Sequence, residues 1–174
     1  PKTRLMIIGA GDYNAYKALA RQLDMQEAVL FTGVQSNPFS FLRKADVYAL
    51  TSESEGFPNA LIEAMAVGIP CISVNCLTGP AEILHEQYEQ CRDDSQIFHA
   101  NYGILTGIFH GEKDMDAQRF TEEERRFAAE LEAVLKDERL YQTYQEAALK
   151  RAEAFGMDRY LCRIRELIET DLAN

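Results

Sequence analysis

Short apolar runs alternate with segments of helical period along the first half of the chain. Four runs have the length and nearly continuous apolar character of buried strands, at residues 4–9, 28–33, 45–51 and 70–75. Amphipathic segments separate them, at residues 14–24, 38–45 and 58–67. Strands and helices that alternate through short connections predict an α/β fold. Because nearly continuous apolar strands fit burial on both faces, we expect a doubly wound parallel sheet.

The pattern changes after residue 78. A short helix is predicted at 79–86 and a strand at 103–109, with a polar stretch without clear period between them. We interpret that stretch as a solvated loop with room for a helical turn, and leave open a contact with an acceptor or a further domain. From Thr121 onward the chain is helical, with a capping box formed by Thr121 and Glu124 and a break at Gly156. No repeat or linker is evident, so we expect residues 1–174 to form a single domain.

Composition narrows the function classes. The formal net charge is −10, which argues against a nucleic-acid groove as the main surface. No apolar run approaches the roughly 20 residues that span a bilayer, and the N-terminal run is too short for a signal peptide. The four cysteines have no CxxC spacing, and the three histidines do not fall at zinc-ligand spacing with them. We expect reduced thiols, no metal site and a cytoplasmic protein.

The stretch SEGFPNALIEAMAVGIP, at 54–70, carries the candidate chemistry. It follows the third predicted strand, where loops of open parallel sheets bind ligands. Pro58 suits the first position of a helix. The backbone N–H groups of Asn59, Ala60 and Leu61 are then free, and with the helix dipole they form a site for phosphate oxygens.

Two acids flank this turn, Glu55 before it and Glu63 in the following helix. Carboxylates accept hydrogen bonds from vicinal hydroxyls. A ligand that places phosphates at these amides and hydroxyl groups at Glu63 and Glu55 would be a nucleotide-diphospho-sugar. From the pattern alone, two solvated acids are an equally good interpretation. A glycosidase acid pair fits poorly, because its carboxyls must face each other across the scissile bond.

The same residues resemble a known family. The run from Glu55 to Ala66 is similar to the Glu-x7-Glu motif of retaining, GT-B-type glycosyltransferases built from two Rossmann-like domains (group 1, family 4-like). Further matching segments are Phe31-Thr32-Gly33-Val34, Asn37-Pro38, Ala45-Asp46, Gly68-Ile69-Pro70 and Thr78 to Leu84. The resemblance covers most of residues 4–110 and implies that the chain is the C-terminal, donor-binding half of such an enzyme.

The resemblance implies roles for individual residues. Glu63 would hold the ribose of the donor, for example a UDP-sugar, and Glu55 would contact the transferred sugar. Val34 would lie at the nucleotide base. Backbone between the acids would meet the diphosphate, and its residues are Gly56, Phe57, Asn59, Ala60 and Leu61. The family needs no metal and no cofactor, since fixed donors stabilise the charge on the leaving diphosphate.

Three glycines outside the motif are further candidates for donor binding. Gly9 and Gly11 form half of a dinucleotide fingerprint after the first strand, although a plain tight turn is the simpler interpretation. Gly79 lies in the Thr78-Gly79-Pro80 turn after the fourth strand, on the predicted ligand side. Glu82 is either a ligand-side acid of this turn or an ordinary first-turn acid.

The chain departs from the family pattern at its start. The family's donor domain begins with a further strand and a helix whose Arg and Lys grip the pyrophosphate, and Lys2 and Arg4 do not match them. We therefore expect the N-terminal acceptor domain and that first strand and helix to be absent. The isolated chain should bind a donor weakly and transfer nothing. The expected activity of the parent protein is sugar transfer with retention to a glycan, lipid-linked or polysaccharide acceptor, with peripheral membrane association left open. A nucleotide-sugar epimerase or a non-catalytic binding module are the alternatives.

Overall fold

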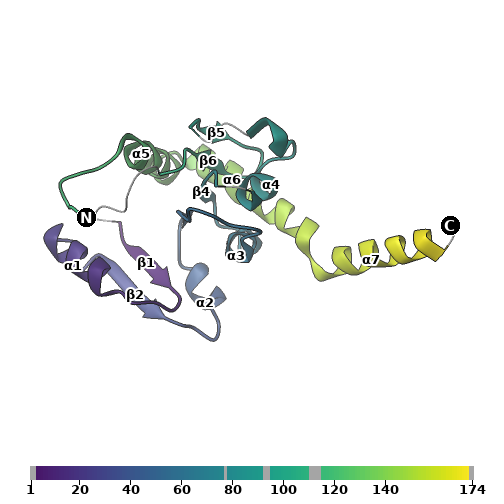
Figure 1. The fold of residues 1–174 in the computed structure, drawn as a ribbon, viewed down its shortest axis with the longest axis horizontal. Helices are drawn as coiled ribbons and strands as arrows, with labels where there is room; N and C mark the ends of the chain where they lie inside the picture. The colour runs from purple at the N-terminus through teal and green to yellow at the C-terminus, as the bar shows by residue number, and fades with distance from the viewer. Residues whose placement is uncertain (1–2, 77, 92–94, 110–114, 173–174) are drawn as a thin grey trace.

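The computed structural model describes residues 3–76, 78–91, 95–109 and 115–172, and their strands form two sheets (Figure 1). In the smaller sheet β1 (Leu5–Ile8) pairs in parallel with β2 (Val29–Gly33). The larger sheet has the order β3-β4-β6-β5. Its strands are β3 (Tyr48–Leu50), β4 (Cys71–Val74), β5 (Phe98–His99) and β6 (Ile104–Thr106). The predicted α/β class is confirmed, but the single predicted sheet is divided into two.

The helices follow the predicted order. Those between the strands are α1 (Asn14–Gln22), α2 (Phe39–Leu42), α3 (Asn59–Ala66) and α4 (Gly79–Leu84). The C-terminal ones are α5 (Glu122–Lys136), α6 (Glu138–Ala152) and α7 (Met157–Leu172). Two short 3-10 helices are η1 (Tyr88–Cys91) and η2 (Glu153–Phe155). Gly156 separates η2 from α7, as predicted, and α7 extends away from the rest of the molecule (Figure 1).

Helices pack on both faces of the larger sheet, as expected for a doubly wound fold. Side chains alternate between the faces of a strand, so the adjacent β4 residues Cys71 and Ile72 belong to different core clusters. The Cys71 cluster is shared with α3, α4 and α6, and includes Leu61 and Leu105. The Ile72 cluster is shared with α5 and α6, and includes Phe127. The core therefore lies around β4 and β6.

Two local predictions can be compared directly with the structure. The capping box of α5 is confirmed: the Glu124 N–H donates to the Thr121 hydroxyl at 3.1 Å, and the Thr121 N–H donates to the Glu124 carboxylate at 2.8 Å. The polar stretch before the last strand contains the η1 turn and also β5, which is antiparallel to β6 and was not predicted. A strand of two residues is too short to show a period.

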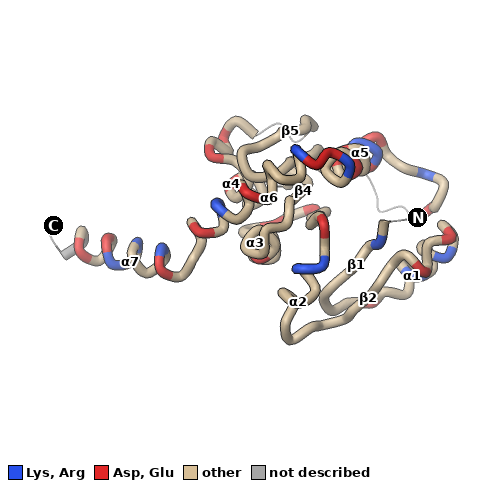
Figure 2. The backbone as a smooth tube through the Cα atoms, turned by 180° about the vertical axis from the view of Figure 1, so that it is seen from behind, with Lys and Arg blue, Asp and Glu red and all other residues tan. Residues whose placement is uncertain are grey.

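Charged residues lie mainly on the helices at the outside of the molecule, and α5 and α7 carry both signs (Figure 2). The strands of both sheets are almost free of Lys, Arg, Asp and Glu (Figure 2). The net negative charge is therefore a property of the outer helices and loops rather than of the sheet region that positions the candidate site.

Candidate donor-binding site

The turn that carries Glu55 is held against the turn after β4. Thr78 donates its backbone N–H to the Glu55 carbonyl at 3.0 Å, in an isolated parallel bridge. A Cβ on Gly79 would lie 2.3 Å from the Gly56 carbonyl oxygen and 2.6 Å from Cδ of Pro58. Only glycine allows this approach of two backbones. The structure thus brings Gly79 to the Glu55 turn, and the close packing explains the glycine independently of any ligand.

The start of α3 differs in one respect from the prediction. Pro58 precedes the first helical residue, and its carbonyl accepts a hydrogen bond from the Leu61 N–H at 3.1 Å. The expectation of a free Leu61 amide is therefore wrong, because the helix opens with a tighter turn. Within the described residues, the amides of Asn59 and Ala60 have no hydrogen-bond partner. Two of the three predicted donors remain available to an anion.

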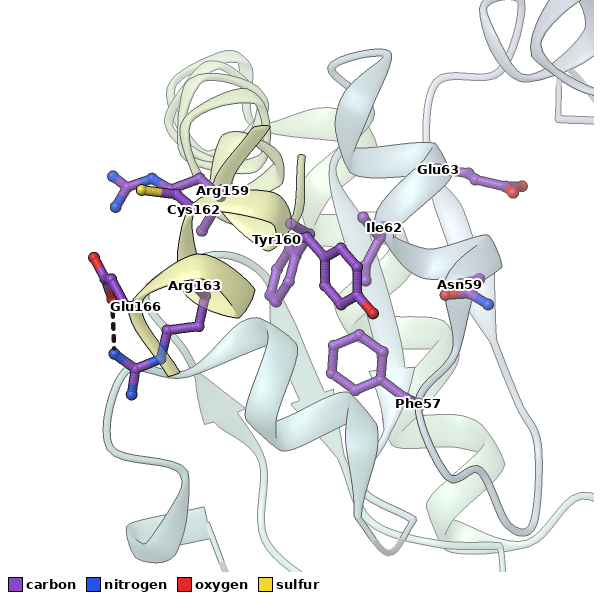
Figure 3. Close-up of a pocket in the computed structure, with 11 residues that line it drawn as sticks. Phe57, Asn59, Ile62, Glu63, Arg159, Tyr160, Cys162, Arg163 and Glu166 are labelled. Carbon is purple, nitrogen blue, oxygen red and sulfur yellow. Dashed lines mark hydrogen bonds and ion pairs between the residues drawn. The ribbon is translucent and has the colours of Figure 1, made fainter. Parts of the chain in front are cut away.

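Glu63 lies one helical turn after Asn59, so both side chains share one face of α3. Figure 3 shows both side chains on one side of α3, and both residues contribute to the lining of a pocket between α3 and α7. Glu55 and Glu63 are both half-buried. Burial, and then the nearby Cys71 thiol and the charges of Glu55 and Glu63, raise the pKa of Tyr48 to about 12. The two carboxylates therefore lie within electrostatic reach of one phenol on β3.

The remaining candidates lie at the ends of the smaller sheet. Gly9 has a φ of 141° and donates its N–H to the Gly33 carbonyl at 3.0 Å, while the Tyr13 hydroxyl donates to the Gly9 carbonyl. The bond to Gly33 continues the pairing of β1 with β2, and the bond from Tyr13 folds the following segment back on Gly9, which is compatible with the simpler interpretation of the Gly9–Gly11 pair as a turn. Val34 follows β2 and is 75% exposed. Its contact with a base, and that of the two glycines with a donor, stay predictions.

The pocket between α3 and α7 is lined by three of the candidate residues, Phe57, Asn59 and Glu63, together with α7 residues that the sequence did not indicate (Figure 3). It has a volume of about 710 Å³, within the range of small-molecule sites. Its aromatic lining consists of Phe57, Phe155 and Tyr160, with the Arg163–Glu166 ion pair at 3.2 Å on its α7 side. The apolar positions of α7 at helical spacing were the available sequence signal for the α7 side of this pocket.

The sequence also led to predictions about the cysteine thiols and about a metal site. All four cysteines are free thiols in the structure, and burial raises the pKa of Cys71. A buried thiol of this kind disfavours the reactive thiolate. In the parts of the chain that the structure describes, no group of three or more His, Cys, Asp or Glu side chains is arranged to hold a metal ion.

Comparison with known proteins gives the family. The model of the family described as "Glycosyl transferases group 1" matches residues 1–92, which include the Glu55 turn, α3 and Gly79. This is more than half of the chain, and the chain belongs to that family. The resemblance inferred from the motif residues is thereby confirmed at the level of the family.

Individual relatives support the same family. An uncharacterized glycosyltransferase of Methanocaldococcus jannaschii is 34% identical over 173 residues, which are 97% of this chain and 42% of that protein. The lipopolysaccharide 1,6-galactosyltransferase of Escherichia coli is 37% identical over 86 residues, which are 47% of this chain and 24% of that enzyme. The chain thus spans about two fifths or less of these relatives.

The fold comparison extends over the whole chain. The crystal structure of Anabaena HepE in complex with UDP matches with a TM-score of 0.74, covering 98% of this chain and 42% of HepE at 19% identity. This likeness confirms the fold. None of the helices in the described residues is both long and apolar enough to cross a membrane.

Proposed function

We propose that the chain is the donor-binding domain of a glycosyltransferase and holds a nucleotide-diphospho-sugar at the start of α3. The observation that carries the proposal is the Glu55–Ala66 turn and helix within the segment that matches the family. The amides of Asn59 and Ala60, which have no partner among the described residues, suit the diphosphate, because a helix N-terminus favours anions. The UDP bound in the HepE structure, which shares this fold, supports a nucleotide at such a domain.

In this proposal Glu63 accepts hydrogen bonds from the ribose diol and Glu55 contacts the transferred sugar. The half-buried environment that the acids share near Tyr48 suits hydrogen bonds to a ligand, because an acid shielded from bulk water exchanges fewer hydrogen bonds with solvent. Transfer proceeds with retention and without a metal. Charge on the departing diphosphate is met by the fixed amide donors and the helix dipole.

The acceptor is a glycan on a lipid or polysaccharide, and a further part of a longer polypeptide binds it. The relatives support this part of the proposal, since they are more than twice as long as this chain and one is named as a lipopolysaccharide galactosyltransferase. A lipid-linked acceptor would place the enzyme in the cytoplasm at the inner face of the membrane.

Calorimetric titration of the full-length protein with uridine, guanosine and adenosine diphosphates tests the binding step. One nucleotide should bind, and Glu63→Ala should weaken it roughly 10- to 100-fold, the loss expected for hydrogen bonds to a charged acceptor. Glu146→Ala on the exposed surface of α6 is the matched control and should bind normally. Unchanged affinity of Glu63→Ala would contradict the proposed site.

Product analysis tests the reaction. Transfer should give a glycoside whose anomeric configuration matches that of the donor. An epimerised nucleotide-sugar would identify the epimerase alternative, and binding without any product would identify a non-catalytic module.

A further inference from the structure

The Glu55 turn is supported from a second direction, by the C-terminal end of α6. On one side the turn packs on Gly79 at the start of α4, as described above. On the other side the ring of Phe57 meets the ring of Phe155 edge to face, with centroids 5.6 Å apart. Phe155 belongs to η2, directly after α6. The turn is therefore held between the start of α4 and the end of α6.

Arg151 of α6 joins these two supports. Its Nε donates to the Ile83 carbonyl at 2.9 Å and its Nη2 to the Glu82 carbonyl at 2.8 Å, both near the C-terminal end of α4. These carbonyls belong to the last turn of the helix, where they lack helical partners. The guanidinium also lies 4.9 Å from the ring centroid of Phe155 and 4.9 Å from that of Tyr102. The half-buried side chain of Arg151 thus contacts both α4 and Phe155, the residue on which Phe57 packs.

The contacts form a closed circuit: the Glu55 turn to α4 through Gly79, α4 to Arg151, Arg151 to Phe155, and Phe155 back to Phe57. Guanidinium is suited to the junction, because its planar fork can bond two carbonyls while its faces stack on rings. Lysine could replace the charge, but not both functions. We infer that Arg151 is a positioning residue, which acts through α4 and Phe155 to orient the turn that presents Glu55 to the transferred sugar.

This inference rests on the proposed function for the role of Glu55, and its consequence is kinetic. A turn that loses one of its two supports should misplace Glu55 by a fraction of an ångström to an ångström. Such misplacement of a group at the reacting centre lowers turnover more than it lowers nucleotide affinity, because Glu63 and the α3 amides hold the nucleotide. Arg151 would share that effect only through Glu55, so the two residues should not act additively.

The test uses the full-length protein and three single variants, together with Glu55→Gln alone and combined with Arg151→Met. Arg151→Met keeps an unbranched apolar stem and removes the guanidinium fork, and Arg151→Lys keeps the charge. Arg126→Met is the control on the exposed surface of α5, where Arg126 pairs with Glu122 at 3.1 Å. We measure kcat and KM for the donor, nucleoside diphosphate affinity, and the thermal midpoint, with kinetics taken well below the lowest midpoint. Hydrogen exchange of residues 55–60 is followed by mass spectrometry.

We expect kcat to fall about 10- to 100-fold in Arg151→Met and nearly as much in Arg151→Lys, with nucleoside diphosphate affinity changed less than about threefold. In a Glu55→Gln background, Arg151→Met should cause no further loss. Exchange at residues 55–60 should become faster in Arg151→Met and stay unchanged in Arg126→Met. A lower thermal midpoint with wild-type turnover per folded molecule would show that Arg151 only stabilises the fold, and would overturn the inference.

The outcomes separate this inference from the proposed function. A wild-type protein that transfers no sugar contradicts the function, and the exchange of residues 55–60 then decides alone whether Arg151 holds the turn. An active wild-type protein whose turnover is insensitive to Arg151 contradicts the inference and leaves the function standing.

Discussion

The two sheets are built from similar sequences and are buried to very different degrees. All four residues of β4 and all three of β6 are buried, whereas β1 and β2 have no buried residue. Leu105 of β6 is fully buried, but Leu30 of β2 is 56% exposed. An apolar sequence is therefore enough to form a strand. The stability that the strand contributes depends on how much of it is buried by the helices that pack on it.

The helices that pack on each sheet explain this difference in burial. Helix α5 covers one face of the larger sheet, α3 and α4 cover the other, and α6 contributes to the core on both. On α1, which precedes β2, only Ala20 is buried. The candidate acids Glu55 and Glu63 extend from the better-packed half, which suits groups that must be held in place.

The largest expected effect is a matched pair of leucine truncations. Leu105→Ala should lower the free energy of unfolding by about 3 to 5 kcal/mol, because it opens a cavity in the core. Leu30→Ala should change it by less than about 0.5 kcal/mol, since more than half of that side chain is already exposed. Urea denaturation measures both. Equal losses would show that the two sheets share one cooperative core, against the contrast described here.

Alkaline pH should destabilise the larger sheet through Tyr48. Burial raises its folded-state pKa from 10 to about 12, so its contribution is complete below pH 10 and is lost as the pH rises to about 12. The loss should reach about 2 to 3 kcal/mol, at 1.4 kcal/mol per pKa unit. Tyr48→Phe should make the stability curve flatter across this window, as followed by denaturation at each pH. Tyr160→Phe on exposed α7 is the control, and an identical flattening there would refute the assignment to Tyr48.

The contact between the Glu55 turn and α4 can be tested by two added methyl groups. A Cβ at Gly79 meets backbone atoms at 2.3 to 2.9 Å, whereas one at Gly56, on the other side of the same contact, has open space. Gly79→Ala should therefore cost about 2 kcal/mol in unfolding free energy, and Gly56→Ala less than about 0.5 kcal/mol. Thermal unfolding of both variants gives the comparison. A tolerated Gly79→Ala would mean that the two turns can separate without loss.

Local patterns allowed much of this architecture to be predicted. Apolar runs of strand length and amphipathic segments located most elements, and the spacing of Thr121 and Glu124 located a helix start to the residue. The division into two sheets depends on which strands meet laterally, which no apolar run reveals. The two residues of β5 are paired only because β6 offers an edge, so their structure is set by tertiary contact.

The candidate site divides in the same way. The order of Glu55, Pro58 and Glu63 along the chain predicted a turn into a helix, and the structure places the acids near one phenol. The Leu61 amide was predicted incorrectly, because the choice between a tight and an open first turn depends on backbone geometry. Arg151 could not be found from sequence, since its partners Ile83 and Glu82 are about seventy residues away and take part through their carbonyls.

The smallest expected effect concerns α5 and α6, the helices that pack on the larger sheet, and whether N-terminal capping stabilises them. Thr121 is exposed, and its hydroxyl accepts the Glu124 N–H, so Thr121→Ala should cost about 1 kcal/mol in unfolding free energy through loss of the cap of α5. Thr143 lies inside α6, where its hydroxyl bonds the Arg139 carbonyl at 2.8 Å. The same substitution there should be neutral or slightly stabilising, because alanine is the better helix former. The expected result in urea denaturation is a loss of stability for Thr121→Ala and no loss for Thr143→Ala. A loss at Thr143 as large as at Thr121 would contradict it and would mean that the hydroxyls stabilise these helices by a route other than capping.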